Sequence, residues 1–186
     1  MKRKRTWLIT DTHLGHAKMV EYCGRPVDHS ERILRNLKTT IKPGDTLIHL
    51  GDVCFGKDAY WHSELMGALY GVWRILVLGN HDNKTVTWYK NHGWDEVFKN
   101  LDRNVRLGVD GDEEVGVHLS HHPLDDRKTH RRGKFNIHGH FHNNDHRMLE
   151  DEKKFYDPKY HKLIAIENTD LLPVNIEDYV SSLKAE

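Results

Sequence analysis

Histidine, aspartate and asparagine recur along this chain in short groups, each directly after an apolar run. The groups are Asp11-Thr12-His13, Gly51-Asp52, Gly79-Asn80-His81-Asp82, Ser120-His121-His122-Pro123 and His138-Gly139-His140-Phe141-His142. Mixed imidazole and carboxylate ligands favour Mn²⁺, Fe, Ni²⁺, Co²⁺ or Zn²⁺ over Mg²⁺ and Ca²⁺, which prefer all-oxygen surroundings. The groups therefore predict a transition-metal site, and metal-assisted hydrolysis is a chemistry that such a site can perform.

Histidine is also unusually abundant. The chain has 16 histidines among 186 residues, and a residue that titrates near neutral pH and binds metals seldom accumulates for packing reasons. Taken alone, the groups at residues 11–13, 51–52 and 79–82 are better explained by solvated turns. For the histidines of residues 138–142 the alternative is a metal-scavenging surface tract. Such tracts, however, lack an apolar strand leading into them. The prediction of a site depends on the groups occurring together.

The elements that must position these groups alternate between short apolar runs and amphipathic stretches. We expect strands at residues 6–10, 46–50, 74–78, 97–100, 104–109, 115–120, 135–137 and 163–166, and helices at residues 28–41, at about 59–70 and within 173–183. Asp28 and Glu31 have the spacing of a capping box, and residues 110–112 suggest a hairpin turn. The first strand–loop–helix units indicate βαβ connections and a partly parallel sheet, whose carboxyl edge is where ligands bind.

Composition restricts the class of protein. A chain of 186 residues fits one domain, which we expect to span residues 1–186. Lys plus Arg and Asp plus Glu both total 28, so the net charge indicates no particular partner. No apolar stretch approaches the roughly 20 residues that cross a bilayer, and Cys23 and Cys54 are too few for a disulfide framework. We expect a cytoplasmic protein that does not enter a membrane.

The order Asp-x-His, Gly-Asp, Gly-Asn-His-Asp, His and Gly-His-x-His resembles that of the calcineurin-like metallophosphoesterase superfamily. The resemblance extends over residues 11–142, and residues 11–16, Asp-Thr-His-Leu-Gly-His, are similar to the start of small stand-alone phage and bacterial members. It implies an α/β fold, namely a four-layer α/β/β/α sandwich with a two-metal site at the strand ends.

The resemblance also implies roles for individual residues. It assigns Asp11, His13 and His142 to one metal, Asn80, His121 and His140 to the other, and Asp52 to a bridge between them. It implies two divalent transition-metal ions, manganese among the candidates, whose bridging hydroxide attacks a phosphoester while His81 acts as general acid. His122 and His138 are expected to point away from the metals.

Two positions depart from the family pattern. Many members continue Gly-Asp with an acidic residue that orients the catalytic histidine and an arginine that contacts phosphate, but this chain has Phe55 and Gly56 there. The protein-phosphatase subgroup is thereby disfavoured. Asp82 is a candidate for orienting His81, and Arg25 is a candidate for the additional cation.

The loop over residues 11–26 is expected to overhang the metals. His16 and Arg25 are therefore candidate substrate-binding residues, because an arginine can hold a phosphate through two parallel hydrogen bonds. A solvated Arg25 without a role in binding is the alternative.

We expect a phosphodiesterase acting on small phosphodiesters such as cyclic nucleotides, with phosphomonoesters as further substrates. A metal-binding module without turnover is one alternative, and His81 beside a complete ligand set favours catalysis over it. A metal-dependent nuclease is the other, supported by five Lys or Arg residues within residues 127–134. The zero net charge and the lack of room for a DNA-binding domain disfavour nucleic acid as the partner.

Overall fold

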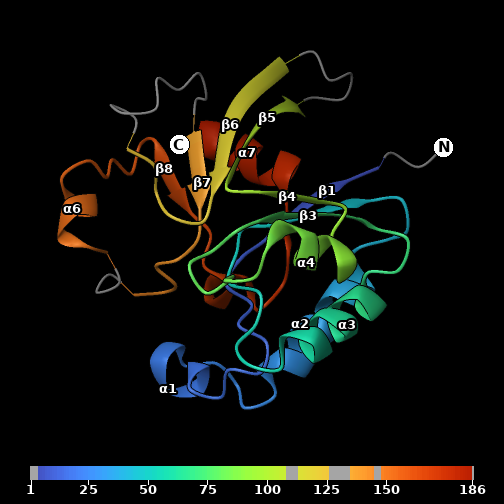
Figure 1. The fold of residues 1–186 in the computed structure, drawn as a ribbon. Helices are drawn as coiled ribbons and strands as arrows, with labels where there is room; N and C mark the ends of the chain where they lie inside the picture. The colour runs from blue at the N-terminus through green and yellow to red at the C-terminus, as the bar shows by residue number, and fades with distance from the viewer. Residues whose placement is uncertain (1–3, 108–112, 126–134, 145–147, 186) are drawn as a thin grey trace.

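The computed structural model describes residues 4–107, 113–125, 135–144 and 148–185. The hairpin turn expected at residues 110–112 and the basic stretch at residues 127–134 lie outside these ranges. Within them, two β-sheets face each other, with helices packed around them (Figure 1).

The first sheet has five strands in the order β4-β3-β2-β1-β9. Its members are β1 (Thr6–Ile9), β2 (Thr46–His49), β3 (Trp73–Val77), β4 (Glu96–Phe98) and β9 (Val174–Asn175). β1 to β4 run parallel, whereas β9 is antiparallel to β1. The predicted βαβ connections and partly parallel sheet are therefore confirmed.

The second sheet has four strands in the order β5-β6-β7-β8. They are β5 (Asn100–Leu107), β6 (Glu113–Ser120), β7 (Phe135–His138) and β8 (His161–Leu163). The strand expected at residues 97–100 is divided between the two sheets, because β4 ends at Phe98 and β5 begins at Asn100. The strand expected at residues 163–166 overlaps β8 only at Leu163, where β8 ends. Residues Ile166–Thr169 form a 3-10 helix, η2, in which the Thr169 hydroxyl donates to the Ile166 carbonyl.

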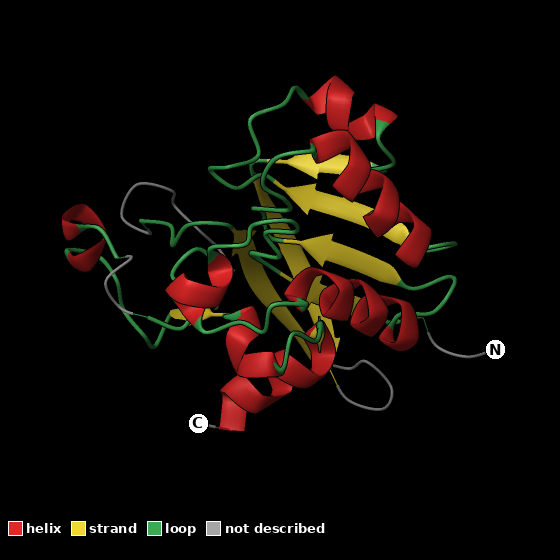
Figure 2. Ribbon diagram, turned by 90° about the horizontal axis from the view of Figure 1, so that it is seen from below, coloured by secondary structure: helices red, strands yellow, loops and turns green. Residues whose placement is uncertain are grey.

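The helices differ in length and position (Figure 2). They are α1 (Met19–Cys23), α2 (His29–Thr40), α3 (Asp58–Ala68), α4 (Val86–Asn91), α6 (Glu150–Lys153) and α7 (Ile176–Ala185). The capping box expected at the start of α2 does not form. Asp28 is the N-cap residue, but its backbone is not extended and its side chain accepts no capping hydrogen bond. No described helix has both the length and the apolar character needed to cross a membrane.

Two apolar clusters hold these layers together. On β1, Trp7 and Ile9 join Leu37 and Leu65 of α2 and α3, whereas Leu8 joins the second sheet in a separate cluster. Both faces of the first sheet are therefore covered, as is usual for parallel sheets. Figure 1 shows α2, α3 and α4 on one side of this sheet, while α7 contacts β1, β9 and β5. The predicted α/β class with two packed sheets is confirmed.

Asp45 ties together the start of β1 and the loop that leads into β2. Its carboxylate accepts hydrogen bonds from the backbone N–H groups of Arg5 and Lys42, at 3.0 and 3.1 Å, and from the indole N–H of Trp7, at 3.0 Å. Burial alone would raise the pKa of Asp45, but these donors hold it below its usual value. A carboxyl whose pKa is lowered by folding stabilises the fold above its unfolded pKa, and this contribution is lost as the pH falls through the folded pKa.

We expect Asp45→Ala to lower the free energy of unfolding by about 1–3 kcal/mol at pH 7, because it leaves the buried indole N–H of Trp7 and two partly buried backbone N–H groups without an acceptor. Urea unfolding measures the difference, with the exposed Asp151→Ala as the matched control. The difference between wild type and Asp45→Ala should shrink as the pH falls below about 4, the unfolded pKa of aspartate. A difference of the same size at pH 7 and in strong acid would contradict the role of the carboxylate.

Candidate functional site

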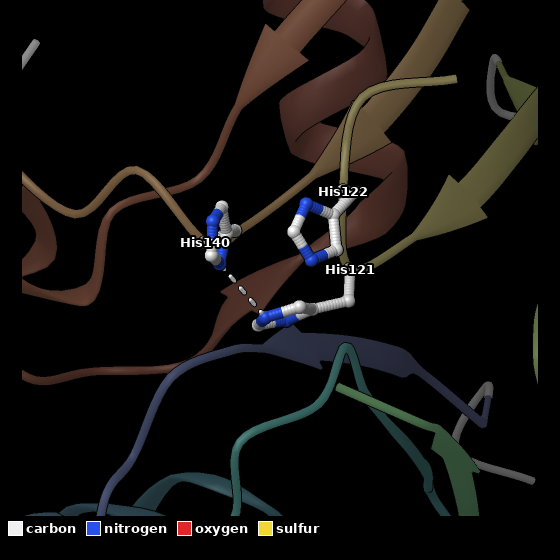
Figure 3. A group of neighbouring side chains, drawn as sticks. All are labelled: His121, His122 and His140. Atoms are coloured by element: carbon white, nitrogen blue, oxygen red, sulfur yellow. Dashed lines mark hydrogen bonds between the residues drawn. The ribbon is translucent and has the colours of Figure 1, made fainter. Parts of the chain in front are cut away.

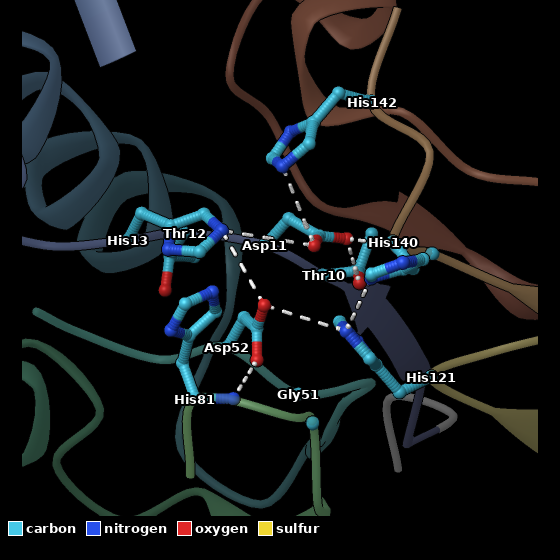
Figure 4. Close-up of polar contacts among 12 residues, drawn as sticks. Thr10, Asp11, Thr12, His13, Gly51, Asp52, His81, His121, His140 and His142 are labelled. Atoms are coloured by element: carbon cyan, nitrogen blue, oxygen red, sulfur yellow. Dashed lines mark hydrogen bonds and ion pairs between the residues drawn. The ribbon is translucent and has the colours of Figure 1, made fainter. Parts of the chain in front are cut away.

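The loops that follow β1, β2, β3, β6 and β7 meet at one end of the two sheets, and their side chains point toward a common centre (Figure 4). These loops carry the residues that the sequence analysis singled out, namely Asp11, His13, Asp52, Asn80, His81, His121, His140 and His142. Parallel neighbours end at the same edge of a sheet, which explains how groups far apart in the sequence come together.

Asp11, His13 and His142 form one group of metal-binding types, with ligand atoms within 4.8 Å of one another. The Oδ1 atom of Asp11 lies 3.9 Å from Nε2 of His13 and 3.8 Å from Nε2 of His142. All three residues are buried, and Asp11 Oδ1 has no hydrogen-bond donor among the described residues. A buried carboxylate oxygen without a partner is unfavourable unless a cation satisfies it. The group therefore fits a metal ion.

Asp52 lies between this group and a second one. Its Oδ2 atom is 3.5 Å from Nε2 of His13 and 3.4 Å from Nε2 of His121. On the far side, Nε2 of His121 lies 2.9 Å from Oδ1 of Asn80 and 3.2 Å from Nδ1 of His140. A single carboxylate oxygen thus faces histidines of both groups, which is the arrangement that a bridging ligand requires.

His122 does not point away as expected. Its ring packs against that of His140 with centroids 3.8 Å apart, and nitrogens of His121, His122 and His140 lie within 4.8 Å of one another (Figure 3). Nδ1 of His122 lies 3.1 Å from Oε1 of Glu152 in α6, a helix that the sequence pattern did not predict. His138, in contrast, is fully buried beside the Gly139 carbonyl and the Tyr156 hydroxyl, in agreement with a packing role.

The candidate ligands share an unusual backbone conformation. Eight described residues other than glycine have positive φ, and five of them are Asp11, His13, Asp52, His140 and His142, at 50°, 42°, 58°, 71° and 55°. The left-handed region is unfavourable for L-residues by roughly 1–2 kcal/mol each. Strain of this kind persists where the surrounding structure imposes it, and it is typical of ligand-binding sites.

Glycines let these loops approach closely. A Cβ atom on Gly79 would lie 2.2 Å from Oδ1 of Asp52, and one on Gly139 would lie 2.3 Å from Oδ2 of Asp11. The same close approach allows the backbone N–H groups of His81 and His140 to donate to these two carboxylates, at 2.8 and 2.9 Å. Each carboxylate is therefore held in place by the neighbouring loop.

The charges of the candidate ligands favour a cation among them. Burial alone would lower the pKa of His121, but the carboxylates of Asp11 and Asp52 raise it to about 9. Burial alone would raise the pKa of Asp52, but the hydrogen bond and charge of His121 hold it below its usual value. Burial, followed by the neighbouring His122, lowers the pKa of His140 to about 3, which leaves the neutral imidazole that a metal requires.

The structure corrects the expectation for Arg25. The arginine side chain is fully buried and donates to the backbone carbonyls of Asp11 and Thr12, at 2.7 and 2.9 Å, and to Oε1 of Glu167, at 2.6 and 2.9 Å. All three guanidinium nitrogens are thereby engaged within the protein. Arg25 positions the loop that carries Asp11, and the expected role as a phosphate clamp does not fit this placement.

Glu167 is a candidate functional residue that the sequence analysis missed. Its Oε1 atom lies 3.0 Å from Nδ1 of His142, which leaves Nε2 of that histidine facing Asp11. Burial alone would raise the pKa of Glu167, but the hydrogen bond from His142 and the charge of Arg25 lower it to about 2. Carboxylates in this position orient metal-binding histidines. An acidic residue directly after the apolar residues 163–166 is the signal that could have identified it.

We expect Glu167→Gln to weaken Mn²⁺ binding by about 10–100-fold, because the amide lacks the charge that orients His142 and Arg25. Calorimetric titration of Mn²⁺ into metal-free protein measures the change, with Glu64→Gln on the exposed face of α3 as the control. Unchanged affinity in a folded Glu167→Gln protein would contradict the orienting role.

His81 and Asp82 occupy different environments in the same loop. The His81 ring is exposed, lies 5.5 Å from the His13 ring between centroids, and makes no hydrogen bond within the described part of the chain. Asp82 was a candidate for orienting it, but its carboxylate makes its hydrogen bonds elsewhere. The Asp82 carboxylate accepts from the backbone N–H groups of Gly79, Asp52 and Val53, at 2.8, 2.8 and 3.2 Å, and so joins two loops.

His16 lies at the rim of the group. The centroid of its ring is 5.8 Å from that of His13, and the ring stacks on Phe55 at 4.3 Å. Burial is the largest of the effects that lower the pKa of His16. The imidazole thus lies beside a candidate ligand, and a role of His16 in substrate binding stays a prediction.

Comparison with known proteins gives relatives along nearly the whole chain. Uncharacterized protein MJ1445 of Methanocaldococcus jannaschii is 27% identical, over 95% of this chain and 90% of that protein. Gene 66 protein of Mycobacterium phage L5 is 28% identical, over 74% of this chain and 77% of that protein. The crystal structure of AQ665, a protein of unknown function from Aquifex aeolicus, has the same fold, with a TM-score of 0.68 and 24% identity over 97% of this chain and 100% of that one.

A family model described as calcineurin-like phosphoesterase matches residues 4–175, a range that contains every strand and every candidate ligand described above. Its members are metal-dependent hydrolases of phosphoesters, in agreement with the buried histidine and aspartate groups. The protein therefore belongs to the calcineurin-like phosphoesterase family.

Proposed function

We propose that this protein is a binuclear metal-dependent phosphodiesterase that hydrolyses small phosphodiesters, cyclic nucleotides among them, and also phosphomonoesters. The observation that supports this most directly is the position of Asp52. Its Oδ2 atom lies within 3.5 Å of His13 and 3.4 Å of His121, which belong to different groups. A shared carboxylate oxygen favours two neighbouring cations over a single one.

Asp11, His13, His142 and Asp52 would hold one ion, and Asn80, His121, His140 and Asp52 the other. When bound, two divalent ions supply Lewis-acid polarisation of the phosphoryl group and activation of water. Two divalent cations and two carboxylates would give the site a formal charge of about +2. A site with this charge favours a phosphate group as its ligand. The mixed donor set favours manganese, iron, nickel, cobalt or zinc.

His81 would donate the proton that the leaving oxygen needs. Its backbone N–H donates a hydrogen bond to Oδ1 of Asp52 at 2.8 Å, and its ring lies exposed beside that of His13. An exposed imidazole whose nitrogens have no hydrogen-bond partner in the described part of the chain can contact a substrate oxygen. Histidine suits this step because imidazole exchanges protons near neutral pH.

The test is an activity screen of metal-reconstituted protein. Mn²⁺-loaded protein should hydrolyse bis(4-nitrophenyl) phosphate and at least one of 2′,3′- and 3′,5′-cyclic AMP. Removal of the metal with a chelator should abolish turnover, and added Mn²⁺ should restore it, because the proposed nucleophile is a water that the metal ions would activate.

Elemental analysis of the same samples completes the test. We expect two ions per chain, and a value that stays at or below one after reconstitution would contradict the binuclear site. Two bound ions without turnover of any ester would instead indicate a metal-binding module, and preferred turnover of long single-stranded DNA would indicate a nuclease.

A further inference from the structure

An aromatic side chain stands exposed at the edge of the candidate site. Phe55 follows Asp52 in the loop after β2, and half of its surface (50%) is accessible. Single exposed apolar side chains are common on protein surfaces. Phe55 differs from these because its ring contacts rings of the site itself.

Two of these contacts fix the position of the Phe55 ring. His16 stacks on it, with centroids 4.3 Å apart and an interplanar angle of 22°. His81 lies with its edge toward Phe55, at 6.0 Å and 72°. We call Phe55 and His16 together the ring platform. It lies next to His81, the residue proposed to donate a proton to the leaving group.

The backbone beneath the ring platform is tied to the candidate ligands. The backbone N–H of Phe55 donates to the Leu14 carbonyl at 3.0 Å, and that of His16 donates to the His13 carbonyl at 3.0 Å. The backbone N–H of His13 in turn donates to the Asp52 carbonyl at 3.0 Å. The backbone of the ring platform is therefore held by the same loops that carry the ligands, so the two rings start from a fixed place beside the centre.

We infer that the ring platform binds a flat aromatic ring in the organic part of the substrate, the chemistry of a nucleobase. The inference rests on the proposed function, since it names the class of phosphoester that the same site accepts. An aromatic ring stacks in an offset or edge-on geometry on another ring, and every nucleobase has a π face that can do so. An aliphatic ester would gain only the burial of its surface.

The test compares two ligands, one with a base and one with a hydroxyl group in its place. They are adenosine 5′-methylenephosphonate and ribose 5-methylenephosphonate, hydrolysis-resistant forms of AMP and ribose 5-phosphate. Calorimetric titration into Mn²⁺-loaded protein gives the ratio of their dissociation constants. Stacking of one base should make the adenosine compound bind about 5- to 150-fold more tightly in the wild type.

Substitutions of the platform provide the second measurement. Phe55→Leu should lower that ratio by about fivefold or more and leave the affinity for the ribose compound nearly unchanged, because leucine offers no π face. Phe55→Trp should retain the ratio. Tyr70→Leu removes an aromatic ring that is 84% exposed in the turn after α3, and as the matched control it should leave the ratio at its wild-type value.

Equal affinities for the two ligands in the wild type, or the same ratio in wild type and Phe55→Leu, would overturn the inference.

A comparison with the tetranucleotide dA4 distinguishes a base in a mononucleotide from a base at the end of a strand. Affinity equal to that of the adenosine compound supports a mononucleotide, and tighter binding supports the end of a strand on the same platform. Failure of the proposed function is distinct, because it would appear as absent ester hydrolysis while the affinity ratio can still be measured.

Discussion

Asp52→Asn should lose at least one of two bound metal ions and most of the activity. Oδ2 of Asp52 lies 3.5 Å from His13 and 3.4 Å from His121, so replacing the carboxylate removes a ligand and a negative charge shared by both groups. A metal ion contributes several kcal/mol of transition-state stabilisation. We therefore expect kcat/KM to fall by about 10²–10³-fold or more.

Elemental analysis and steady-state kinetics on bis(4-nitrophenyl) phosphate measure the two effects on the same preparation. Asp151→Asn is the control, because its carboxylate is 88% exposed on α6. Thermal unfolding of the metal-free proteins establishes that Asp52→Asn is folded, which matters because Oδ1 of Asp52 also accepts from the His81 backbone. Near-normal activity with two ions bound would remove the bridging assignment.

His81→Gln should keep both metal ions and still lose activity in a way that depends on the leaving group. Glutamine can occupy the same space and form hydrogen bonds, but it cannot deliver a proton to the departing oxygen. General acid catalysis contributes roughly 10²–10⁴-fold, so a loss of this size is expected for alkoxide leaving groups. The loss should be small for 4-nitrophenolate, which departs without a proton.

The measurement is kcat/KM along a series of aryl and alkyl phosphodiesters, for wild type and variant. His92→Gln is the matched control. His92 lies directly after α4, and its ring stacks on that of Trp88 within the helix. A steeper dependence on leaving-group acidity in His81→Gln alone would support proton donation. Equal losses along the whole series would count against it and would indicate a general disturbance of the loop.

The elements best predicted from the sequence were those with a strong local pattern. α2 and the strands β1, β2 and β3 lie within one or two residues of the expected ranges, because their apolar residues repeat at the helix or strand period. The short helices α1, α4 and α6 were missed, since five, six and four residues carry little periodicity. The position of the ligand loops was predictable because strand ends can be recognised without knowledge of the tertiary structure.

The surroundings of the site depend on contacts that no local pattern contains. Arg25 pairs with Glu167 across 142 positions of the sequence, so nothing near Arg25 indicates that its donors are already engaged. His122 faces inward beside Glu152 of α6, a residue 30 positions away. The sequence identified the types of side chain at the centre, whereas their partners required the folded chain.

The left-handed backbone at Asp11, His13, Asp52, His140 and His142 has a consequence for attempts to improve the protein's heat resistance. Glycine adopts this conformation without a steric penalty, so a glycine at any of these positions would relieve strain. A mutant library selected only for survival of the fold at high temperature should therefore enrich glycine where the lost side chain holds no other loop, as at His13, whose Nδ1 atom has no hydrogen-bond partner among the described residues. The enriched proteins would be thermally stable but inactive, because a stabilising change at a strained functional site removes a side chain that the activity needs. Heat-resistant variants that still work must come from a selection that demands turnover in every round.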